Sequence, residues 1–166
     1  MLRVILPETC AAYIDQLEKV IAAEAEQGFE RSAIRRLAAL LPSSPDVAEA
    51  SAARLRLSKA QRARLMRAAE RKASDVSNPK ALAYSIGIEF AIDRLLLLGK
   101  DARRIADFTP PRFPLKGGQI VARGVAAGPE VARLMQTVEK RWVAEGFPDI
   151  ARIDAILDDE LRQSSG

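Results

Sequence analysis

Residues 78–99 read NPKALAYSIGIEFAIDRLLLLG and form the most apolar stretch of the chain. Asn78 followed by Pro79 is typical of a helix start, and Gly99 is typical of a helix end. Apolar side chains occur on almost every face of the predicted helix, which is the pattern of a helix buried on all sides. We therefore expect this helix at the centre of a helical core. A glycine inside a helix costs about 1 kcal/mol relative to alanine, so Gly87 predicts a close helix crossing.

Helical signals continue upstream of this stretch. A helix is predicted from Thr9, which is a plausible N-cap, to Gly28, which is a plausible C-terminal stop. Ile14, Leu17 and Ile21 recur along one face of this helix.

The rest of the chain carries similar helix start and stop signals and shows no strand-like alternation of apolar and polar residues. Ser44 with Pro45 marks one further helix start, and Ser58 with Gln61 forms a capping-box pattern at another. After residue 99 we predict a short helix, a proline-rich linker, and then helices near 117–123, 129–144 and 148–162.

The linker divides the chain. Pro110, Pro111 and Pro114 exclude helix between the short helix and those that follow. We predict an all-α fold of two parts: an irregular helical bundle over residues 1–108, and a smaller tail over residues 109–166 built around a helical hairpin.

Composition excludes several chemistries. The chain has no histidine and one cysteine, which rules out Ser-His-Asp and Cys-His catalysis and zinc sites built on these residues. Cys10 is expected to be a packed small hydrophobe in a reducing compartment, which favours a cytoplasmic protein. The longest apolar runs are too short for a transmembrane helix, and we expect no signal peptide and no membrane partner.

Charge is arranged in blocks. Residues 31–72 hold eleven basic and three acidic side chains, and residues 100–123 hold six basic and two acidic. Residues 1–30 and 145–160 are acidic instead. Localised positive charge indicates a polyanion partner such as nucleic acid, although arginine-rich helices also serve simply to solvate a surface. For residues 31–72 alone, both interpretations stay open.

Residues 113–134, FPLKGGQIVARGVAAGPEVARL, interrupt the helical pattern with ordered glycines and prolines. We expect a short helix, a turn with Gly124 in the left-handed conformation, and a second helix starting at Gly128 and Pro129. Unbonded amides at such a start form an anion site, with Lys116 and Arg123 close enough to assist. The same pattern also occurs in helical hairpins that bind nothing.

The segment over residues 112–147, RFPLKGGQIVARGVAAGPEVARLMQTVEKRWVAEGF, resembles the C-terminal tail of bacterial class II tRNA nucleotidyltransferases of the alphaproteobacterial type. This family comprises the CCA-adding enzymes and the closely similar poly(A) polymerases. The chain departs from the family pattern at Gln119 and Ala132, where aspartate and glycine are usual. The matching positions are Pro114, Leu115, Gly117, Gly124, Gly128, Pro129 and Val131. LRVILPE (2–8), RRLAALLP (35–42) and ARLRLSKAQRARL (53–65) resemble, in order, the exit from the family's neck and its body helices.

The resemblance implies a body and tail that grip the acceptor–TΨC half of tRNA through shape and backbone phosphates. In this family nucleotide addition belongs to a head domain, whose Gly-Ser loop and Asp-x-Asp pair hold Mg²⁺ and ATP or CTP. Neither motif occurs in this sequence. We therefore expect no catalytic residue, metal or cofactor in this chain, and we expect tRNA or another structured RNA and the enzyme's own head and neck as partners. DDELR (158–162) is spaced like the family's nucleotide-selecting element, but we interpret it as a charged helix end.

The predicted RNA contacts form two groups. Arg64, Arg67 and Arg71 share one helical face. The second group surrounds the linker and the hairpin and comprises Lys100, Arg103, Arg104, Arg112, Lys116, Gly117, Arg123 and Gly128. Two alternatives remain at this point: a helical protein-interaction or oligomerisation module, and a free-standing helix-hairpin-helix DNA binder.

Overall fold

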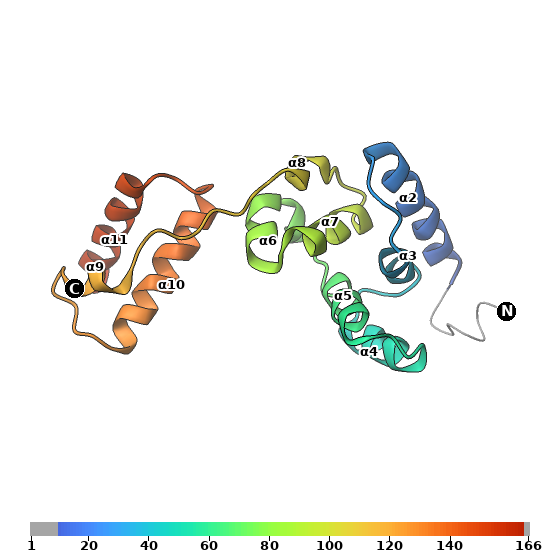
Figure 1. Cartoon of the computed structure of the whole chain (residues 1–166), viewed down its shortest axis with the longest axis horizontal. Coiled ribbons are helices and arrows are strands. Elements are labelled where there is room, and N and C mark those ends of the chain that lie inside the picture. Colours follow the sequence, from blue (N-terminus) through green and yellow to red (C-terminus); the bar gives the residue numbers. More distant parts are fainter. Residues whose placement is uncertain (1–9, 165–166) are drawn as a thin grey trace. The chain divides into compact units, whose positions relative to one another are not determined.

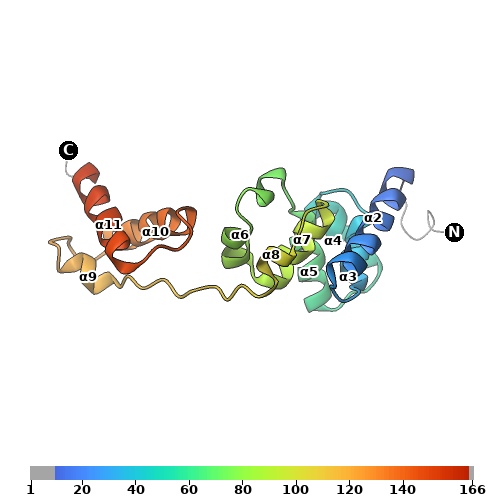
Figure 2. The same cartoon turned by 90° about the horizontal axis from the view of Figure 1, so that it is seen from above.

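The computed structural model describes residues 10–164, which contain ten α-helices, one 3₁₀ helix and no strand. The predicted all-α class is confirmed. The chain divides into two compact units between Phe108 and Thr109, which is also the boundary expected from the prolines (Figures 1 and 2). We call the first unit the body and the second the tail, and we describe each by itself.

Local sequence signals set most helix ends in the body. Ser58 and Gln61 form the predicted capping box, and the Asn78 side chain accepts a hydrogen bond from the Ala81 amide at 3.0 Å. Gly28 ends its helix with a φ of 74°. The body contains α2 (Ala11–Gln27), α3 (Ala33–Ala39), α4 (Pro45–Arg54), α5 (Lys59–Ala69), the 3₁₀ helix η1 (Ala73–Val76), α6 (Pro79–Ile86), α7 (Ile88–Leu97) and α8 (Arg103–Ala106).

Helix α7 is the centre of the body, because it contacts α2, α3, α5, α6, α8 and η1. Leu97 packs into a core made by α2 to α5, while Ala91, Leu95 and Leu96 pack into a second core with α6 and α8. Each fully buried leucine contributes about 1.5–3 kcal/mol of transfer free energy. The helix is apolar on several faces because it lies between two cores.

The stretch 78–99 is two helices rather than one, which corrects the prediction of a single helix. Gly87 has φ 95° and ψ 149°, so it ends α6 and caps α7. A Cβ placed on Gly87 would meet only Phe90, at an ordinary contact distance of 3.6 Å. The glycine is therefore needed for its backbone conformation and not for a close helix crossing.

Replacing Gly87 by alanine is expected to lower the free energy of unfolding of the body by about 1–3 kcal/mol, because other residues rarely adopt this conformation. Gly118, which has no positive φ and open space around it, is the matched control, and Gly118→Ala should change stability far less. Thermal unfolding by far-ultraviolet circular dichroism measures both. Equal stability of the two variants would contradict this role.

The apolar face predicted for α2 faces the core only in part, because Leu17 packs against the core while the other two residues do not. Ile14 and Ile21 are 44% and 39% exposed, whereas Val20 and Glu24 are buried. Glu24 lies inside because it pairs with two arginines of α3. Cys10 holds the N-cap position and is exposed, which corrects its prediction as a packed residue; the predicted cap Thr9 lies outside the described residues.

The tail is a three-helix unit formed by α9 (Gly117–Val121), α10 (Pro129–Ala144) and α11 (Ile150–Ser164). Trp142 anchors its core: the ring packs against Phe113 and Phe147, with centroids 5.2 and 5.0 Å away, and its Nε1–H donates to the Pro148 carbonyl at 2.8 Å. The buried aliphatic residues are Leu115, Ile120, Leu134, Val138, Ile153, Ile156 and Leu157.

The hairpin follows the sequence prediction closely. Gly124 has a φ of 92°, Gly128 is the N-cap of α10 with a φ of 147°, and Pro129 is the first helical residue. The DDELR segment lies within α11, where Arg162 bonds Asp159 at 2.5 Å, as expected of a charged helix end.

Candidate nucleic-acid interface

Arg64 is held by acids of α7 and is not a free cation. Its Nε donates to Asp93 Oδ2 at 2.6 Å, and a second nitrogen bonds Glu89. The hydrogen bond to Asp93 raises the pKa of the Arg64 guanidinium. Asp93 is buried and also accepts from Arg35 Nε at 2.7 Å.

This pairing is part of a buried ionic network that joins four helices of the body. Arg35 of α3 bridges Asp93 of α7 and Glu24 of α2, with both contacts at 2.7 Å. Arg36 bonds the other oxygen of Glu24 at 2.8 Å, and Arg64 of α5 closes the network through Asp93. Burying a charged side chain is costly unless it is paired and hydrogen-bonded in this way. The network therefore links α2, α3, α5 and α7, and Arg64 is occupied within it.

The other two cations of the first group have different surroundings. Arg67 is half exposed and lies 3.9 Å from Glu70. Arg71 is partly buried and donates to the carbonyls of Leu41 at 3.1 Å and Ala68 at 3.2 Å. Burial lowers the pKa of the Arg71 guanidinium. The structure thus does not present Arg64, Arg67 and Arg71 as one free basic face.

The second group contains both paired and unpaired cations. In the body, Arg103 bonds Asp101 at 2.9 Å, which raises the pKa of Arg103 and lowers the pKa of Asp101. Lys100 and Arg104 have no carboxylate at ion-pair distance among residues 10–164. Together with Asp101 they line a small cavity of about 150 Å³ beside Pro79.

In the tail, Arg112 and Lys116 are exposed and likewise have no acidic partner within the described part of the chain. The Lys116 amide donates to Gln119 Oε1 at 2.7 Å, which fixes the start of α9. Gly117 lies close to α10, because a Cβ placed there would sit 3.4 Å from Val131 Cγ1. Its small size therefore serves helix packing.

Arg123, which the sequence predicts to assist an anion at the start of α10, is paired with two acids of α11. Its two terminal nitrogens bond Asp154 and Asp158, each at 2.6 Å. These long-range pairs tie the end of α9 to α11. Arg123 is available to a phosphate only if these bonds break.

The start of α10 is open but not strongly positive. Gly128 is exposed with nothing within 4 Å of its Cβ position, so a phosphate can approach the backbone. Glu130 in the first turn bears a negative charge, and its hydrogen bonds from Arg133 lower its pKa. This carboxylate offsets the attraction of the helix start for an anion.

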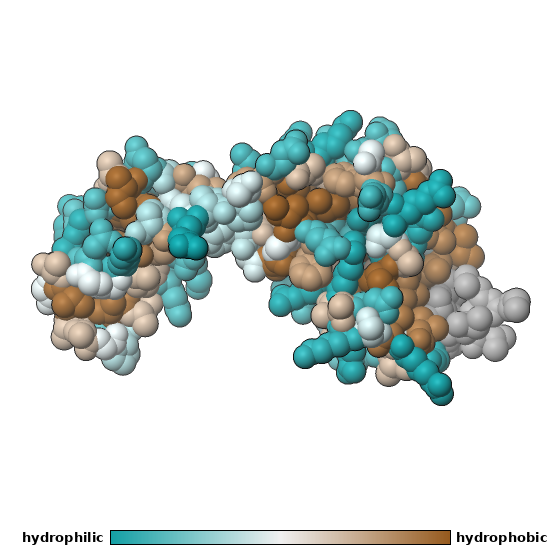
Figure 3. All heavy atoms as spheres, viewed as in Figure 1, coloured by the Kyte–Doolittle hydropathy of each residue, from teal (hydrophilic) through white to brown (hydrophobic). Residues whose placement is uncertain are grey.

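Among residues 10–164, four of the predicted contacts therefore remain as exposed cations without an acidic partner: Lys100, Arg104, Arg112 and Lys116. We call them the linker cations, because they lie within 17 residues of sequence on both sides of the proline-rich linker. On the face shown in Figure 3, hydrophilic residues surround separate hydrophobic patches on both units.

Six cations outside the predicted set also have no acidic partner within the part of the chain that the structure describes: Lys19, Arg31, Arg56, Lys59, Lys72 and Lys140. Sequence reasoning did not single them out, since a sequence does not show which cations have acidic neighbours in space. Within residues 10–164, no group of three or more cysteine or acidic side chains is arranged to hold a metal ion, and no helix is long and apolar enough to cross a membrane. Comparison of the chain with protein-family models, curated proteins and solved structures gave no match.

Proposed function

We propose that this chain binds structured RNA through its phosphate backbone, as the non-catalytic body and tail of a tRNA nucleotidyltransferase or poly(A) polymerase. The RNA would be the acceptor–TΨC half of tRNA, and a separate head and neck would add the nucleotides with Mg²⁺ and ATP or CTP. The sequence resemblance supplies the family, and the surface chemistry of the chain supports the mode of binding.

The linker cations are the observation that carries this proposal. Four positive side chains without acidic partners among residues 10–164 lie on both sides of the proline-rich linker: Lys100 and Arg104 precede it, and Arg112 and Lys116 lie at its end, before α9. Flexible, unpaired lysine and arginine side chains bind phosphates without selecting a base sequence. Stacking surfaces are scarce, because Trp142 is buried and every phenylalanine and tyrosine is at least partly buried. Recognition would therefore rest on backbone and shape.

A salt titration tests this function. Log K for a tRNA minihelix should fall linearly with log salt concentration, and each phosphate contact should contribute about 0.7–0.9 to the slope. Replacing the four linker cations by glutamine should reduce the slope by about 3 and weaken binding at low salt at least about tenfold. Fluorescence anisotropy with labelled RNA measures both quantities.

The matched control replaces four other unpaired cations by glutamine, with the same change in net charge: Lys19, Arg56, Lys59 and Lys140. This variant should keep most of the affinity. A slope near zero for the unmodified chain would remove nucleic-acid binding, and equal affinity for duplex DNA and the minihelix would favour the DNA-binding alternative.

One observation favours the alternative of a protein-interaction module. Ile14 and Ile21 lie seven residues apart on α2 and are both substantially exposed, and this spacing suits contact with another helix. If this face joins two copies of the chain, Ile14→Glu together with Ile21→Glu should convert a dimer to a monomer in sedimentation analysis. A chain that is monomeric at every concentration excludes self-association.

A further inference from the structure

A second cationic feature of the body lies outside the linker. A cavity of about 670 Å³ opens between the end of α5, η1, α6 and the start of α4. Its polar lining includes Ser43, Ser74 and Ser85, and part of its wall is formed by Leu82 and Ile86. Two consecutive cations, Arg71 and Lys72, face this space from the end of α5.

Arg71 has unused hydrogen-bonding capacity here. Its guanidinium is partly buried and donates one bond each to two carbonyls, of Leu41 and Ala68. A guanidinium has five N–H donors, so three have no partner within the described residues. No carboxylate lies at ion-pair distance from it among residues 10–164, so its charge is not neutralised by an ion pair.

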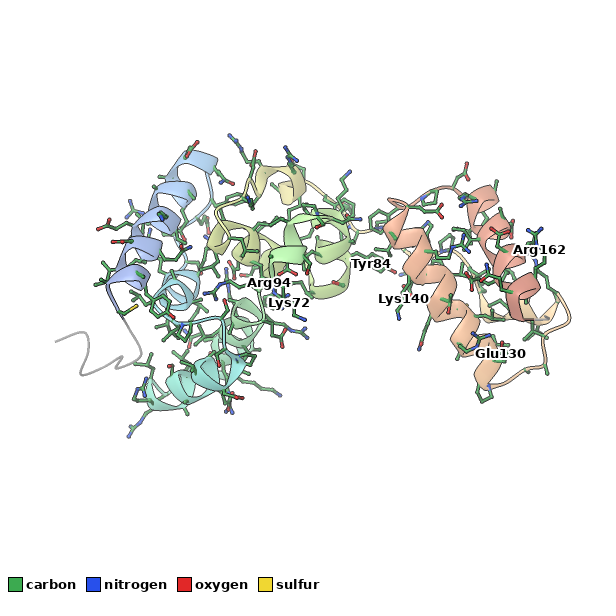
Figure 4. The ribbon with its side chains drawn as sticks, turned by 180° about the vertical axis from the view of Figure 1, so that it is seen from behind. Lys72, Tyr84, Arg94, Glu130, Lys140 and Arg162 are labelled. Atoms are coloured by element: carbon green, nitrogen blue, oxygen red, sulfur yellow. The ribbon has the colours of Figure 1, made fainter. Side chains whose placement is uncertain are left out.

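The acids that line the same cavity are already bound to another cation. Arg94, which is buried, donates to Glu70 at 2.8 Å and to Asp75 at 3.4 Å. Asp75 also accepts the backbone N–H of Lys72 at 2.9 Å. The Lys72 ammonium itself has no acidic partner in the described range. Lys72 and Arg94 are labelled in Figure 4.

Charge is therefore unbalanced in this cavity. Arg71, Lys72 and Arg94 bring three positive charges, and Glu70 and Asp75 bring two negative ones. An anion with several acceptor oxygens would satisfy the free donors of Arg71, the Lys72 ammonium and the hydroxyls of Ser43 and Ser74 together. The apolar wall of Leu82 and Ile86 suits an organic group attached to that anion.

We propose that this cavity is a binding site for a phosphate ester, with Arg71 and Lys72 holding the phosphate and the Leu82–Ile86 wall receiving the attached sugar or base. An RNA backbone or a free nucleotide can supply this chemistry. The site is independent of the linker cations, so it does not rest on the function proposed above.

Adenosine monophosphate is the first probe. It is titrated into the full ¹⁵N-labelled chain, and binding is followed by NMR through the amide chemical shifts of the protein. The amides of Ser43, Lys72 and Ser74 should shift in a saturable manner. Lys72→Gln should raise the dissociation constant about five- to tenfold, because it removes one charged hydrogen bond. Lys72 is exposed and its side chain makes no bond in the described structure, so this variant should fold normally.

Lys59→Gln is the matched control, since Lys59 lies in α5 outside the cavity and, like Lys72, has no acidic partner among residues 10–164. The affinity of the Lys59→Gln variant for adenosine monophosphate should stay within about twofold of the affinity of the unmodified chain, because salt screens distant exposed charges. The proposal is overturned if adenosine without phosphate binds equally well, if the two lysine variants weaken binding equally, or if the shifts occur elsewhere.

Two competition arms identify the source of the phosphate. Displacement of the nucleotide by a single-stranded RNA oligonucleotide supports an RNA backbone as the ligand. Displacement by inorganic phosphate and not by the oligonucleotide supports a small phosphorylated molecule. Nucleotide binding at Lys72 in a chain that shows no salt-dependent affinity for tRNA would leave this site intact and remove the proposed function. Salt-dependent affinity for tRNA in a chain that binds no nucleotide at Lys72 would support the proposed function and remove this site.

Discussion

Replacing Asp93 by alanine is expected to lower the free energy of unfolding of the body by about 3–5 kcal/mol, which is the usual cost of removing one partner from a buried ion pair. Asp93 is 1% exposed and accepts hydrogen bonds from both Arg35 and Arg64. Its loss leaves Arg35, which is also buried, with Glu24 as its single acidic partner. A small domain often has little more stability than this in total.

Glu89→Ala is the matched control. Glu89 binds the same Arg64, but its side chain is 62% exposed, so the pair contributes no more than about 1 kcal/mol. Chemical denaturation followed by circular dichroism compares the two variants with the unmodified chain. A similar, small loss for both would show that the buried network does not stabilise the body.

The helix ends of this protein were largely predictable because their causes are local. A capping box such as Ser58 with Gln61 acts within four residues, and so does the Gly128–Pro129 start of α10. The predicted helix at 129–144 has the bounds found in the structure. The linker prolines act locally as well, and the two units divide at the expected place.

The break at Gly87 was missed although its cause is also local. A glycine inside an apolar run fits a continuous helix that contacts another closely, and it fits two helices joined at a positive φ. The sequence pattern is the same in both cases. The structure has the second arrangement, since Gly87 with its φ of 95° ends α6 and caps α7.

The candidate site was harder to predict because its chemistry depends on long-range pairing. Arg64 and Arg104 look equivalent in the sequence, yet Arg64 meets Asp93, 29 residues away, and Arg104 meets no carboxylate in the described range. Arg123 likewise finds its acids 31 and 35 residues away. A count of basic residues therefore overstates the number of cations available to RNA.

The second large effect is expected in the tail. Leu134 of α10 is 1% exposed, and Leu134→Ala should lower the stability of the tail by about 2–5 kcal/mol through lost burial and a residual cavity. Units of fewer than about 70 residues have little stability in reserve, so much of the tail population should unfold. The exposed Val121, 41% accessible, is the matched control, and Val121→Ala should cost well under 1 kcal/mol.

The single tryptophan makes this test specific to one unit. Trp142 lies in the core of the tail, so its fluorescence reports unfolding of the tail, whereas circular dichroism reports both units. Leu134→Ala should move the fluorescence transition and leave the main dichroism transition of the body in place, and Asp93→Ala should do the reverse. Coincident shifts of both signals in both variants would show that body and tail unfold as one cooperative structure.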